Sequence, residues 1–376
     1  MGLGVFGGGI ESAKFLSRYC THLLVTDLRG ENVLAESIAA LEGLPIEYRL
    51  GEHRKQDFEN ADVVIHSPAV RPDNPLLQGA RDRGAEVTME MSLFIEACPA
   101  RTVGITGSNG KTTTALLAYE MLCEVMQRAQ PELEGKWAES VGNAPTSGGK
   151  VWLGGNCGEP LINRLQDMTA DDVVVLELSS FQLQDWHRIK QSCDISVITN
   201  ITPNHLDWHQ DMDEYIWAKS AVFAHSSNSI VLLNREGQGL PQLADALRNR
   251  ENFNWYSLEL KAGIYFLPDE GESIVCASGA GGVMASQIGP VADRNDLNLP
   301  GYFNWSNAVG AAGAACWASR DHVLREGRYV SGALRRFQGV EHRLEYGGKI
   351  KGARCYTDSV APTHARSLAG VRAFCT

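Results

Sequence analysis

The stretch 103–122, VGITGSNGKTTTALLAYEML, decides the fold of this chain. Apolar residues lead into a glycine-rich turn, and Lys111 with three threonines opens an apolar run of helical spacing. A glycine-rich turn between a strand and a helix presents backbone N–H groups to phosphate, and Gly-Lys-Thr is typical of a P-loop. Five residues separate Gly104 from Gly110, whereas the common P-loop has four at that place. The stretch therefore predicts a nucleotide site of a particular kind.

Composition narrows the class of protein. The 376 residues are enough for two or three domains, and 44% hydrophobic with 21% charged residues is ordinary for a soluble globular protein. A net charge of −11 argues against a nucleic-acid partner. The nine cysteines form no CxxC pair, which indicates reduced thiols. No apolar run reaches the roughly 18 residues of a membrane span. We expect a soluble, cytoplasmic protein without membrane contact.

The first 99 residues alternate between strand and helix patterns. HLLVTDLRG (22–30) is an apolar run ending in an acidic residue, and ADVVIHSPAV (61–70) is a buried strand entering a turn. Residues 32–41 between them have helical spacing. Such alternation predicts a parallel, doubly wound sheet of Rossmann type over residues 1–99. Its first strand is curtailed, because the chain opens at MGLGVFGGG.

A second α/β unit is expected over residues 100–340, with the character of a P-loop ATPase. Its strands are predicted at 102–105, 173–178, 195–200 and 229–233, and a small-residue helix at 304–318 should pack on the sheet. Residues 127–150 are polar and rich in Gly, Pro and Ser, which favours a surface insertion. Residues 341–376 begin a third α/β segment, too short for a core of its own.

The opening glycines form a second candidate phosphate site. Gly2, Gly4 and Gly7 match GxGxxG, and Asp27 ends the next strand where a ribose-contacting carboxylate would lie. A tight strand–helix turn with no ligand is the alternative. If a nucleotide binds there, the motif does not distinguish a dinucleotide from a UDP group, because both would be bound by the same backbone N–H donors.

The loop after residue 105 gives the stronger signal. The N–H groups of Gly107 to Lys111 would converge on phosphates, Lys111 would neutralise the β and γ oxygens, and the Thr112 hydroxyl suits Mg²⁺. A glycine turn with a merely solvated lysine is the alternative. We predict a nucleoside triphosphate site.

Three further side chains could complete such a site. Glu177 follows four apolar residues in DVVVLELSSFQLQ, where a metal-binding carboxylate is needed, although it could instead cap or pair. His205, in NITPNHLDWH, is either a metal ligand or a solvated histidine. Lys219, in YIWAKSAVF, could be a plain surface lysine. The residues alone leave all three open.

In their order, these motifs resemble those of the Mur ligases and folylpolyglutamate synthetases. GITGSNGKTTT resembles that family's GxxGxNGKT loop, which accounts for the spacing. GGNCG (154–158), LELSSFQL (176–183), NITPNHLDWH and YIWAKSAVF follow in the family's order. GVEHRLE (339–345) resembles its hinge, and the Ser-Ser-Phe-Gln run resembles the D-glutamate-adding members. The likeness extends over nearly the whole chain.

The resemblance implies a set of site residues. Lys111, Glu177, His205 and Lys219 would be catalytic, and Thr112, Glu177, His205 and a CO₂-carbamylated Lys219 would hold Mg²⁺. Where the family has histidine and lysine, this chain has Phe303 and Val360, so two contacts are missing. The implied ATP-binding residues are Gly107, Ser108, Asn109, Gly110, Lys111, Thr112, Thr113, Asn304, Asn307, Arg343 and Asp358. The implied UDP-sugar residues are Gly4, Val5, Phe6, Asp27, Leu28, Arg29, Ser67, Asn156, Ser179 and Gln182.

The resemblance further implies ATP-dependent amide ligation through an acyl phosphate, with UDP-N-acetylmuramoyl-L-alanine and D-glutamate as substrates in cytoplasmic peptidoglycan precursor synthesis. We expect a monomer. Relatives continue for most of another domain, so we expect this chain to ligate weakly or not at all. Two rivals stay open: another ligase of the superfamily, including a folate-extending one, and a non-catalytic UDP-sugar-binding relative. A simple P-loop kinase or GTPase fits the loop spacing and motif order least well.

Overall fold

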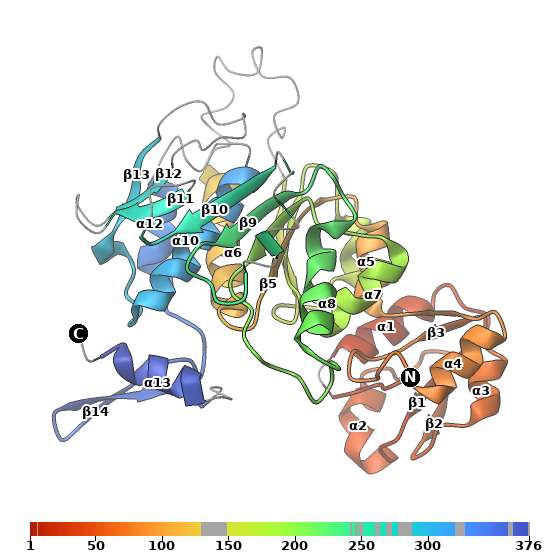
Figure 1. Ribbon diagram of the computed structural model, residues 1–376. Helices are drawn as coiled ribbons and strands as arrows, with labels where there is room; N and C mark the ends of the chain where they lie inside the picture. Colours follow the sequence, from red (N-terminus) through yellow and green to blue (C-terminus); the bar gives the residue numbers. More distant parts are fainter. Residues whose placement is uncertain are drawn as a thin grey trace.

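The computed structural model describes residues 1–5, 7–128, 149–240, 243–244, 247, 250, 252–259, 264–267, 273–276, 288–319, 328–359 and 364–374. Figure 1 shows an N-terminal α/β part, a central part built on a large sheet, and a small C-terminal part beyond it. The ends of the chain lie on opposite sides of the central part.

The N-terminal part contains two pairs of parallel strands, β1 with β2 and β3 with β4. Residues Met1 and Gly2 run between the pairs. The Gly2 N–H donates to the carbonyl of Thr26 at 2.8 Å, and the Ser67 N–H donates to the carbonyl of Met1 at 3.0 Å. The elements are α1 (Gly8–Leu16), β1 (Leu23–Asp27), α2 (Glu31–Ala39), β2 (Ile46–Leu50), α3 (Lys55–Glu59), β3 (Val63–Ile65), α4 (Pro75–Asp82), β4 (Glu86–Thr88) and α5 (Glu90–Ala97).

The central sheet has nine strands in the order β13-β12-β11-β10-β9-β8-β5-β7-β6. Neighbours from β6 through β11 run parallel, whereas β12 and β13 are antiparallel. Its strands are β5 (Arg101–Thr106), β6 (Val151–Gly155), β7 (Val173–Glu177), β8 (Ile195–Ile198), β9 (Ile230–Asn234), β10 (Phe253–Ser257), β11 (Ile264–Leu267), β12 (Ser273–Cys276) and β13 (Ile288–Asp293). Its helices are α6 (Lys111–Arg128), η1 (Ile162–Asp167), α7 (Ser180–Ile189), α8 (Met212–Ala224), η2 (Arg294–Asp296), α10 (Tyr302–Ala318) and α12 (Arg328–Arg336).

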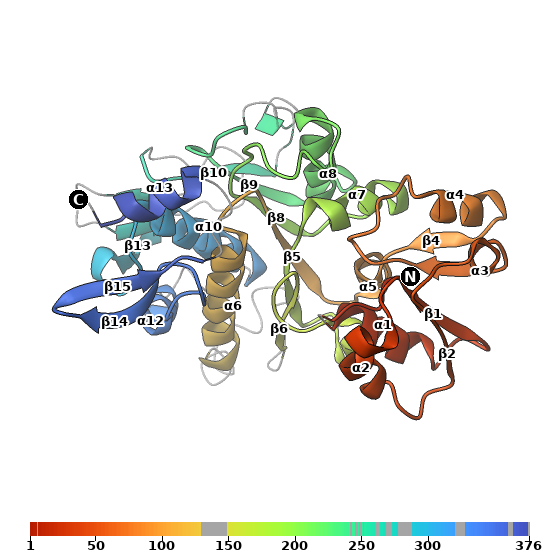
Figure 2. The ribbon, with the colours of Figure 1, turned by 90° about the horizontal axis from the view of Figure 1, so that it is seen from below.

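Helices cover both faces of this sheet, as Figures 1 and 2 show. Side chains of a strand alternate between the faces. Val103 and Ile105 of β5 pack among α6, α10 and α12, whereas Val174 and Leu176 of β7 pack among α5, α7 and α8. Because no face of the central strands meets water, their sequences are continuously apolar. This explains why the predicted strands could be located from apolar runs.

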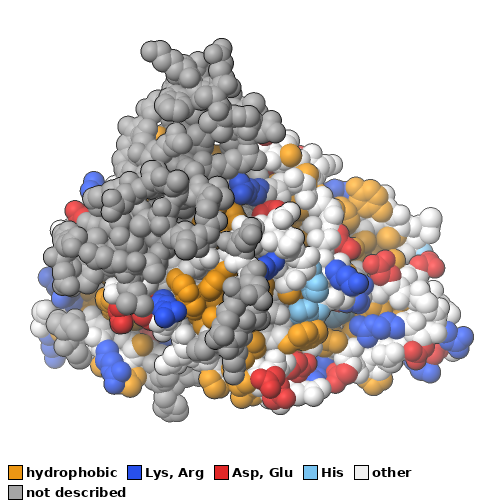
Figure 3. All heavy atoms as spheres, turned by 45° about the horizontal axis from the view of Figure 1, so that its top comes forward, with side chains coloured by type: hydrophobic (Ala, Val, Ile, Leu, Met, Phe, Trp, Pro, Cys, Tyr) orange, Lys and Arg blue, Asp and Glu red, His pale blue; other side chains and the backbone are white. Residues whose placement is uncertain are grey.

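At the molecular surface, α7 and α8 are joined by aromatic contacts. The ring of His187 stacks on that of Trp217 with centroids 4.0 Å apart, and His225 Nε2 lies 2.9 Å from His187 Nδ1. Figure 3 shows histidine side chains gathered beside basic ones on the face it displays. These contacts hold the outer ends of the two helices together.

The C-terminal part consists of one antiparallel strand pair and a helix. β14 (Glu345–Ile350) pairs with β15 (Ala353–Thr357), and α13 (His364–Arg372) packs near them. The ring of Tyr356 in β15 lies 4.4 Å from that of Phe374, so the residues just after α13 pack on the strands.

The structure confirms the predicted α/β class and the predicted strands and helices of the first two parts. The helix expected at 304–318 is α10, and the C-terminal segment has the expected strands and helix. The insertion expected at 127–150 lies mostly outside the described residues, although residues 127 and 128 belong to α6. In the described part of the chain, no helix is both long and apolar enough to cross a bilayer.

Replacement of Phe94 should destabilise the protein strongly. Phe94 lies on α5, is fully buried, and packs in the cluster beneath α7 and α8. Phe94→Ala should lower the free energy of unfolding by about 3–5 kcal/mol, because it leaves a cavity that the helices cannot fill. Urea denaturation followed by circular dichroism measures this. Val33→Ala, at an exposed position of α2, should change it by less than about 0.5 kcal/mol. A loss below about 1 kcal/mol for Phe94→Ala would contradict the packing described.

Candidate functional site

The phosphate loop connects β5 to α6 and needs glycine at two positions. Gly107 has φ 145° and Gly110 has φ 83°, a region that other residues rarely adopt. A Cβ atom on Gly107 would lie 2.0 Å from Thr199 Oγ1, and one on Gly110 would lie 2.3 Å from Asn307 Oδ1. The loop is therefore clamped between the end of β8 and helix α10.

Neighbouring residues fix the shape of this loop. The Asn109 N–H donates to Asn200 Oδ1 at 3.0 Å, and Asn200 Nδ2 donates back to the Asn109 carbonyl at 3.1 Å. The Ser108 N–H donates to the Asn200 carbonyl at 2.8 Å. The Ser108 hydroxyl donates to the Thr202 carbonyl at 3.0 Å and accepts from the Thr202 N–H at 2.9 Å. Ser108 and Asn109 thus hold the loop in place.

This arrangement corrects one detail of the predicted phosphate cradle. We expected all N–H groups from Gly107 to Lys111 to converge on phosphate, but those of Ser108 and Asn109 are used by Asn200. The first N–H groups of α6, from Lys111 to Thr113, have no acceptor within the helix. They lie at its positive end and are donors available to an anion.

Positive charge gathers at the start of α6. The half-buried Lys111 ammonium donates to the Ser108 carbonyl at 3.4 Å. Burial lowers the pKa of Lys111, the Glu177 carboxylate opposes this, and the nearby Arg343 and Arg366 lower the pKa further. Cations repel one another, so their convergence here indicates a site for a multiply charged anion. The predicted Arg343 and the unpredicted Arg366 both belong to the C-terminal part.

Lys219 is buried beneath the phosphate loop, so the interpretation as a plain surface lysine is wrong. Only 1% of it is exposed. Its Nζ donates to the Gly107 carbonyl at 3.0 Å and to Thr106 Oγ1 at 3.3 Å, and lies 4.6 Å from the centre of the Tyr215 ring. Burial first, and then the Lys111 charge, hold the pKa of Lys219 well below its ordinary value, although Glu177 opposes them. A neutral amine at this place is a nucleophile.

Glu177 ends β7 beside the loop. Its register partner on β5 is Ile105, and only 5% of it is exposed. The Asn156 N–H donates to the Glu177 carbonyl at 2.8 Å. A Cβ atom on Gly155 would lie 2.1 Å from that same carbonyl oxygen, so the two strand ends touch. Burial and the neighbouring Glu177 carboxylate raise the pKa of the Cys157 thiol. Cys157 belongs to the GGNCG motif, but the sequence assigned it no role.

His205 lies in the loop between β8 and α8. Its φ of 56° is left-handed, and its ring meets Phe181 edge-on at 4.9 Å. Loss of part of its hydration, together with the charges of Lys111 and Lys219, lowers the pKa of His205. The ring is therefore near both lysines and tends to stay neutral, as metal coordination requires.

Within the described residues, no group of three or more His, Cys, Asp or Glu side chains is placed to hold a metal unaided. Mg²⁺ commonly takes one or two protein carboxylates and completes its shell with phosphate oxygens and water. The buried Glu177 beside the phosphate loop fits that pattern, and Thr112 lies in the first turn of α6, directly after that loop.

Helix α10 meets the loop through two buried asparagines. Asn304 Nδ2 donates to the Pro300 carbonyl at 2.7 Å, and Asn307 Nδ2 donates to Asn304 Oδ1 at 3.3 Å. Asn307 Oδ1 also accepts from the Thr114 hydroxyl at 3.4 Å, and it is the atom that packs on Gly110. Phe303 is exposed beside them. Asp358 lies near Gly370 of α13, and Val360 is outside the described residues.

The N-terminal candidate residues surround the glycine turn. Asp27 receives a bidentate contact from Arg29, at 2.9 and 2.8 Å, and a hydrogen bond from the Gly4 N–H at 3.1 Å. Burial opposes ionisation, but the contacts from Arg29 and Gly4 outweigh it and lower the pKa of Asp27 to about 2. Its carboxylate thus holds the turn and orients Arg29. Val5 and Leu28 are exposed, and Phe6 lies outside the described residues.

Four other candidate residues lie outside the glycine turn. Ser179 and Gln182 form a capping box at the start of α7, in which Ser179 Oγ donates to Gln182 Oε1 at 2.9 Å and accepts from the Gln182 N–H at 3.3 Å. Asn156 is exposed after β6. Ser67 accepts from the Ala69 N–H at 3.3 Å, and its Cβ would meet one on Gly2 at 2.9 Å. The spacing S-x-x-Q is itself a signal for a capping box, so this structural role could have been predicted.

Comparison with known proteins identifies the family of this chain. The family model described as Mur ligase middle domain matches residues 105–315, and that described as Mur ligase MurD-like, N-terminal domain, matches residues 1–89. The chain belongs to the Mur ligase family. The first model spans the phosphate loop, Glu177, His205, Lys219 and α10.

Among relatives of this Mur ligase, the protein from Clostridium novyi named UDP-N-acetylmuramoylalanine–D-glutamate ligase is 34% identical over 375 residues, which are 100% of this chain and 72% of that protein. The protein of the same name from a Roseiflexus species is 35% identical over 381 residues, covering 100% and 74%. The recognised family resemblance is therefore confirmed over the whole chain.

Solved structures of Mur ligases share the fold. A UDP-N-acetylmuramate:L-alanyl-gamma-D-glutamyl-meso-diaminopimelate ligase from Neisseria meningitides matches with a TM-score of 0.52 at 16% identity, covering 90% of this chain and 97% of that one. A murein peptide ligase from Psychrobacter arcticus matches with a TM-score of 0.51 at 13% identity, covering 94% and 71%.

Removal of the Asp27 charge should weaken the protein in a pH-dependent way. Because the folded-state pKa of Asp27 is lowered from 3.8 to about 2, its contribution is present above pH 3.8 and is lost as the pH falls towards 2. Asp27→Asn should cost about 1–2 kcal/mol at pH 7, since Arg29 keeps part of its solvation, and the difference should shrink below pH 4.

Thermal unfolding of wild type and variant between pH 7 and 3 measures this effect. Glu52→Gln, which removes an exposed carboxylate paired with Arg54, is the matched control and should have little effect at any pH. An Asp27→Asn difference that stays constant between pH 7 and 3 would show that the ion pair with Arg29 is not its source.

Proposed function

We propose that this chain serves in ATP-dependent amide ligation, the addition of D-glutamate to UDP-N-acetylmuramoyl-L-alanine in peptidoglycan precursor synthesis, and that it is a monomer. The observation that carries the proposal is a buried lysine beneath a phosphate loop, with Glu177 beside it, in a chain one third identical to relatives named for this reaction. Residues 1–99 would hold the UDP-sugar, residues 100–340 the ATP, and residues from 341 would begin the ligase part.

The reaction would proceed in two transfers. The alanine carboxylate oxygen attacks the γ-phosphorus of ATP, a P–O bond forms, and ADP leaves. The amine of D-glutamate then attacks the acyl carbon, the tetrahedral intermediate expels phosphate, and the amine proton passes to solvent. Lys111 and Arg343 would stabilise the negative charge that develops during phosphoryl transfer.

We further propose that Thr112 and Glu177 hold one Mg²⁺, and that His205 and Lys219 hold a second. When bound, these ions would screen the phosphate oxygens from the attacking carboxylate. Glu177 supports the proposal because it is a buried carboxylate at the end of the strand next to the phosphate loop. His205 supports it because its neighbours favour the neutral, coordinating ring.

The role of Lys219 would be that of a carbamate. The neutral Nζ adds to the carbon of CO₂ and loses one proton, which turns a cationic side chain into a carboxylate-like anion. Its lowered pKa supplies the neutral amine that this addition needs. The anion would stand near Lys111, and would offset part of the repulsion that Arg343 and Arg366 exert on that lysine.

We propose the remaining ligand contacts because their residues lie in or near the phosphate loop and the N-terminal glycine turn. Gly107 and Gly110 let the phosphate loop pass close to Thr199 and Asn307. The proposed nucleotide contacts beyond Lys111 and Thr112 are Gly107, Ser108, Asn109, Gly110, Thr113, Asn304, Asn307, Arg343 and Asp358. The proposed UDP-sugar contacts are Gly4, Val5, Phe6, Asp27, Leu28, Arg29, Ser67, Asn156, Ser179 and Gln182.

Labelled bicarbonate tests the carbamate. Protein equilibrated with ¹³C-bicarbonate near pH 8 should give a carbamate carbonyl resonance that Lys219→Met abolishes, because burial holds the pKa of this amine well below its ordinary value. A resonance from the N-terminal amine, whose pKa is lowered to about 6, would persist in the variant and is assigned by that persistence. Lys190→Met, at an exposed position, should leave the resonance unchanged. The carbamate proposal fails if wild type gives no such signal, or if the signal survives in Lys219→Met.

Calorimetric titration tests the substrate assignment. UDP-N-acetylmuramoyl-L-alanine should bind at least about tenfold more tightly than UDP-N-acetylmuramic acid, because the ligated carboxylate must be recognised beside the phosphate loop. Equal binding of both would contradict recognition of the alanine. Binding of neither would overturn the proposal and favour a folate-extending ligase, which titration with a folate would then identify.

A further inference from the structure

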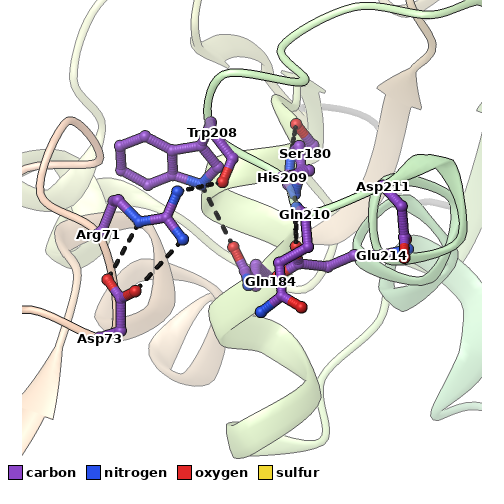
Figure 4. A network of polar contacts seen from close by, with 9 residues as sticks. All are labelled: Arg71, Asp73, Ser180, Gln184, Trp208, His209, Gln210, Asp211 and Glu214. Carbon is purple, nitrogen blue, oxygen red and sulfur yellow. Dashed lines mark hydrogen bonds and ion pairs between the residues drawn. The ribbon is translucent and has the colours of Figure 1, made fainter.

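A network of polar contacts joins the N-terminal part to the loop that carries His205, as Figure 4 shows. We call residues 201–211, between β8 and α8, the histidine loop. The Arg71 guanidinium comes from the turn after β3 and reaches across to this loop. Nothing in the predicted catalytic set includes Arg71, and no motif of the sequence singled it out.

Arg71 makes three contacts. Its Nη1 donates to the Trp208 carbonyl, and its guanidinium carbon lies 5.7 Å from the centre of the Trp208 ring. Its other edge faces Asp73, with Nε donating to Oδ1 at 3.1 Å and Nη2 to Oδ2 at 3.3 Å. The carboxylate thus aims the guanidinium at the loop, and a planar fork with five donors is suited to serve both partners.

Behind Trp208, the histidine loop is anchored to the central part. The Trp208 Nε1–H donates to Gln184 Oε1 at 3.5 Å, and its ring lies 4.7 Å from that of Phe181. His209 is buried, with Nε2 2.9 Å from the Ser180 hydroxyl. These contacts fix the second half of the loop. His205 is exposed, and its ring meets the Phe181 ring edge-on.

His205 therefore depends on the position of Trp208. Both the Trp208 and His209 N–H groups donate to the His205 carbonyl, at 3.0 and 2.9 Å. They form a turn with a left-handed residue at its start. A shift of Trp208 would rotate this turn and displace the imidazole from its place near Lys111 and Lys219. Arg71 ties this turn to the N-terminal part through the Trp208 carbonyl.

The turn that carries Arg71 also carries Ser67, a proposed UDP-sugar contact. The Val70 N–H donates to the Ser67 carbonyl at 2.9 Å, and Arg81 Nη1 donates to the Pro72 carbonyl at 2.8 Å, so residues 67–74 form one supported unit. One end of this unit would meet the UDP-sugar and the other holds the histidine loop.

We propose that Arg71 is a positioning residue for the ligation reaction. It sets His205 by holding the Trp208 carbonyl, and it ties the placement of the UDP-sugar domain to that of the phosphate site. The role assigned to His205 rests on the proposed function, whereas the mechanical tie rests on the contacts alone. The proposal predicts that loss of Arg71 affects the rate of reaction more than the binding of substrates.

Hydrogen exchange measured by mass spectrometry tests the tie without any ligand. In Arg71→Ala, amides of the histidine loop should exchange faster. The Trp208 carbonyl loses its donor, so the turn opens more often and the hydrogen bonds from the Trp208 and His209 N–H groups to the His205 carbonyl break with it. Arg71→Lys keeps a donor for the Trp208 carbonyl but lacks the fork, so it should restore part of the protection. The matched control is Arg164→Ala. Arg164 pairs with Asp167 at 3.5 Å and lies 5.6 Å from the Trp152 ring, both within the central part.

Steady-state ADP release with all three substrates tests the catalytic consequence. Arg71→Ala should lower kcat by about tenfold to a hundredfold and leave each KM within about twofold, as expected for misplacement of a reacting group. Arg164→Ala should change neither exchange of the histidine loop nor kcat.

Unchanged exchange in Arg71→Ala would overturn the proposal. So would a raised KM for the UDP-sugar with an unchanged kcat, since Arg71 would then be a binding residue. If wild type binds no UDP-sugar and releases no ADP, the proposed function fails, and the exchange measurement still decides whether Arg71 holds the loop.

Discussion

The parallel register of three strands is the constraint on which the site depends. β5 lies between β7 and β8, with Ile105 opposite Glu177 and Thr106 opposite Ile198. All three strands therefore end at one edge, and the segments that follow them, the phosphate loop, α7 and the histidine loop, leave that edge together. A slip by one residue would turn Glu177 to the other face of the sheet. Packing of the alternating apolar residues against two helix layers prevents such a slip.

Electrostatics explains why so many polar groups are tolerated there. Lys219 is buried with two hydrogen bonds and an aromatic ring, and Lys111 stands near two arginines and one carboxylate. In isolation such a set is unfavourable, because burial penalises each charge and like charges repel. The lowered pKa of Lys219 favours loss of one of these charges, and a bound polyanion would offset the repulsion among the others. The fold thus stores an electrostatic preference for such a ligand, in the manner of a preorganised anion site.

Much of this could be predicted from the sequence, because the relevant signals are local. The Gly-Lys-Thr run identifies the phosphate loop, and apolar runs locate β5, β7, β8 and β9 because both of their faces are buried. Lys219 could not be placed in the same way. Helix α8 is buried around much of its circumference, so its periodicity does not say which side faces the loop. The tie between Arg71 and Trp208 joins residues 137 apart, and only the folded chain brings them together.

Asn200 gives a similar lesson on a smaller scale. It follows β8 in the NITPNHLDWH motif, where the sequence pointed to His205. Its side chain and its carbonyl nevertheless each accept a hydrogen bond from an N–H group of the phosphate loop. A motif predicts which residues approach the phosphates, whereas the hydrogen-bond partners of those residues depend on a segment about 90 residues away. Which N–H groups hold the loop in place and which are free to bind a ligand therefore depends on the tertiary structure.

The contact between Gly107 and Thr199 restricts which amino-acid substitutions this site can accept. A side chain at 107 would need the space of the Thr199 hydroxyl, which itself donates to the Asn109 carbonyl at 2.6 Å. No single substitution at 107 can be accommodated without also giving up that hydrogen bond, and the left-handed backbone adds a separate penalty. Variation at the two positions is thereby coupled, and a lineage that altered one would pass through a weakened intermediate.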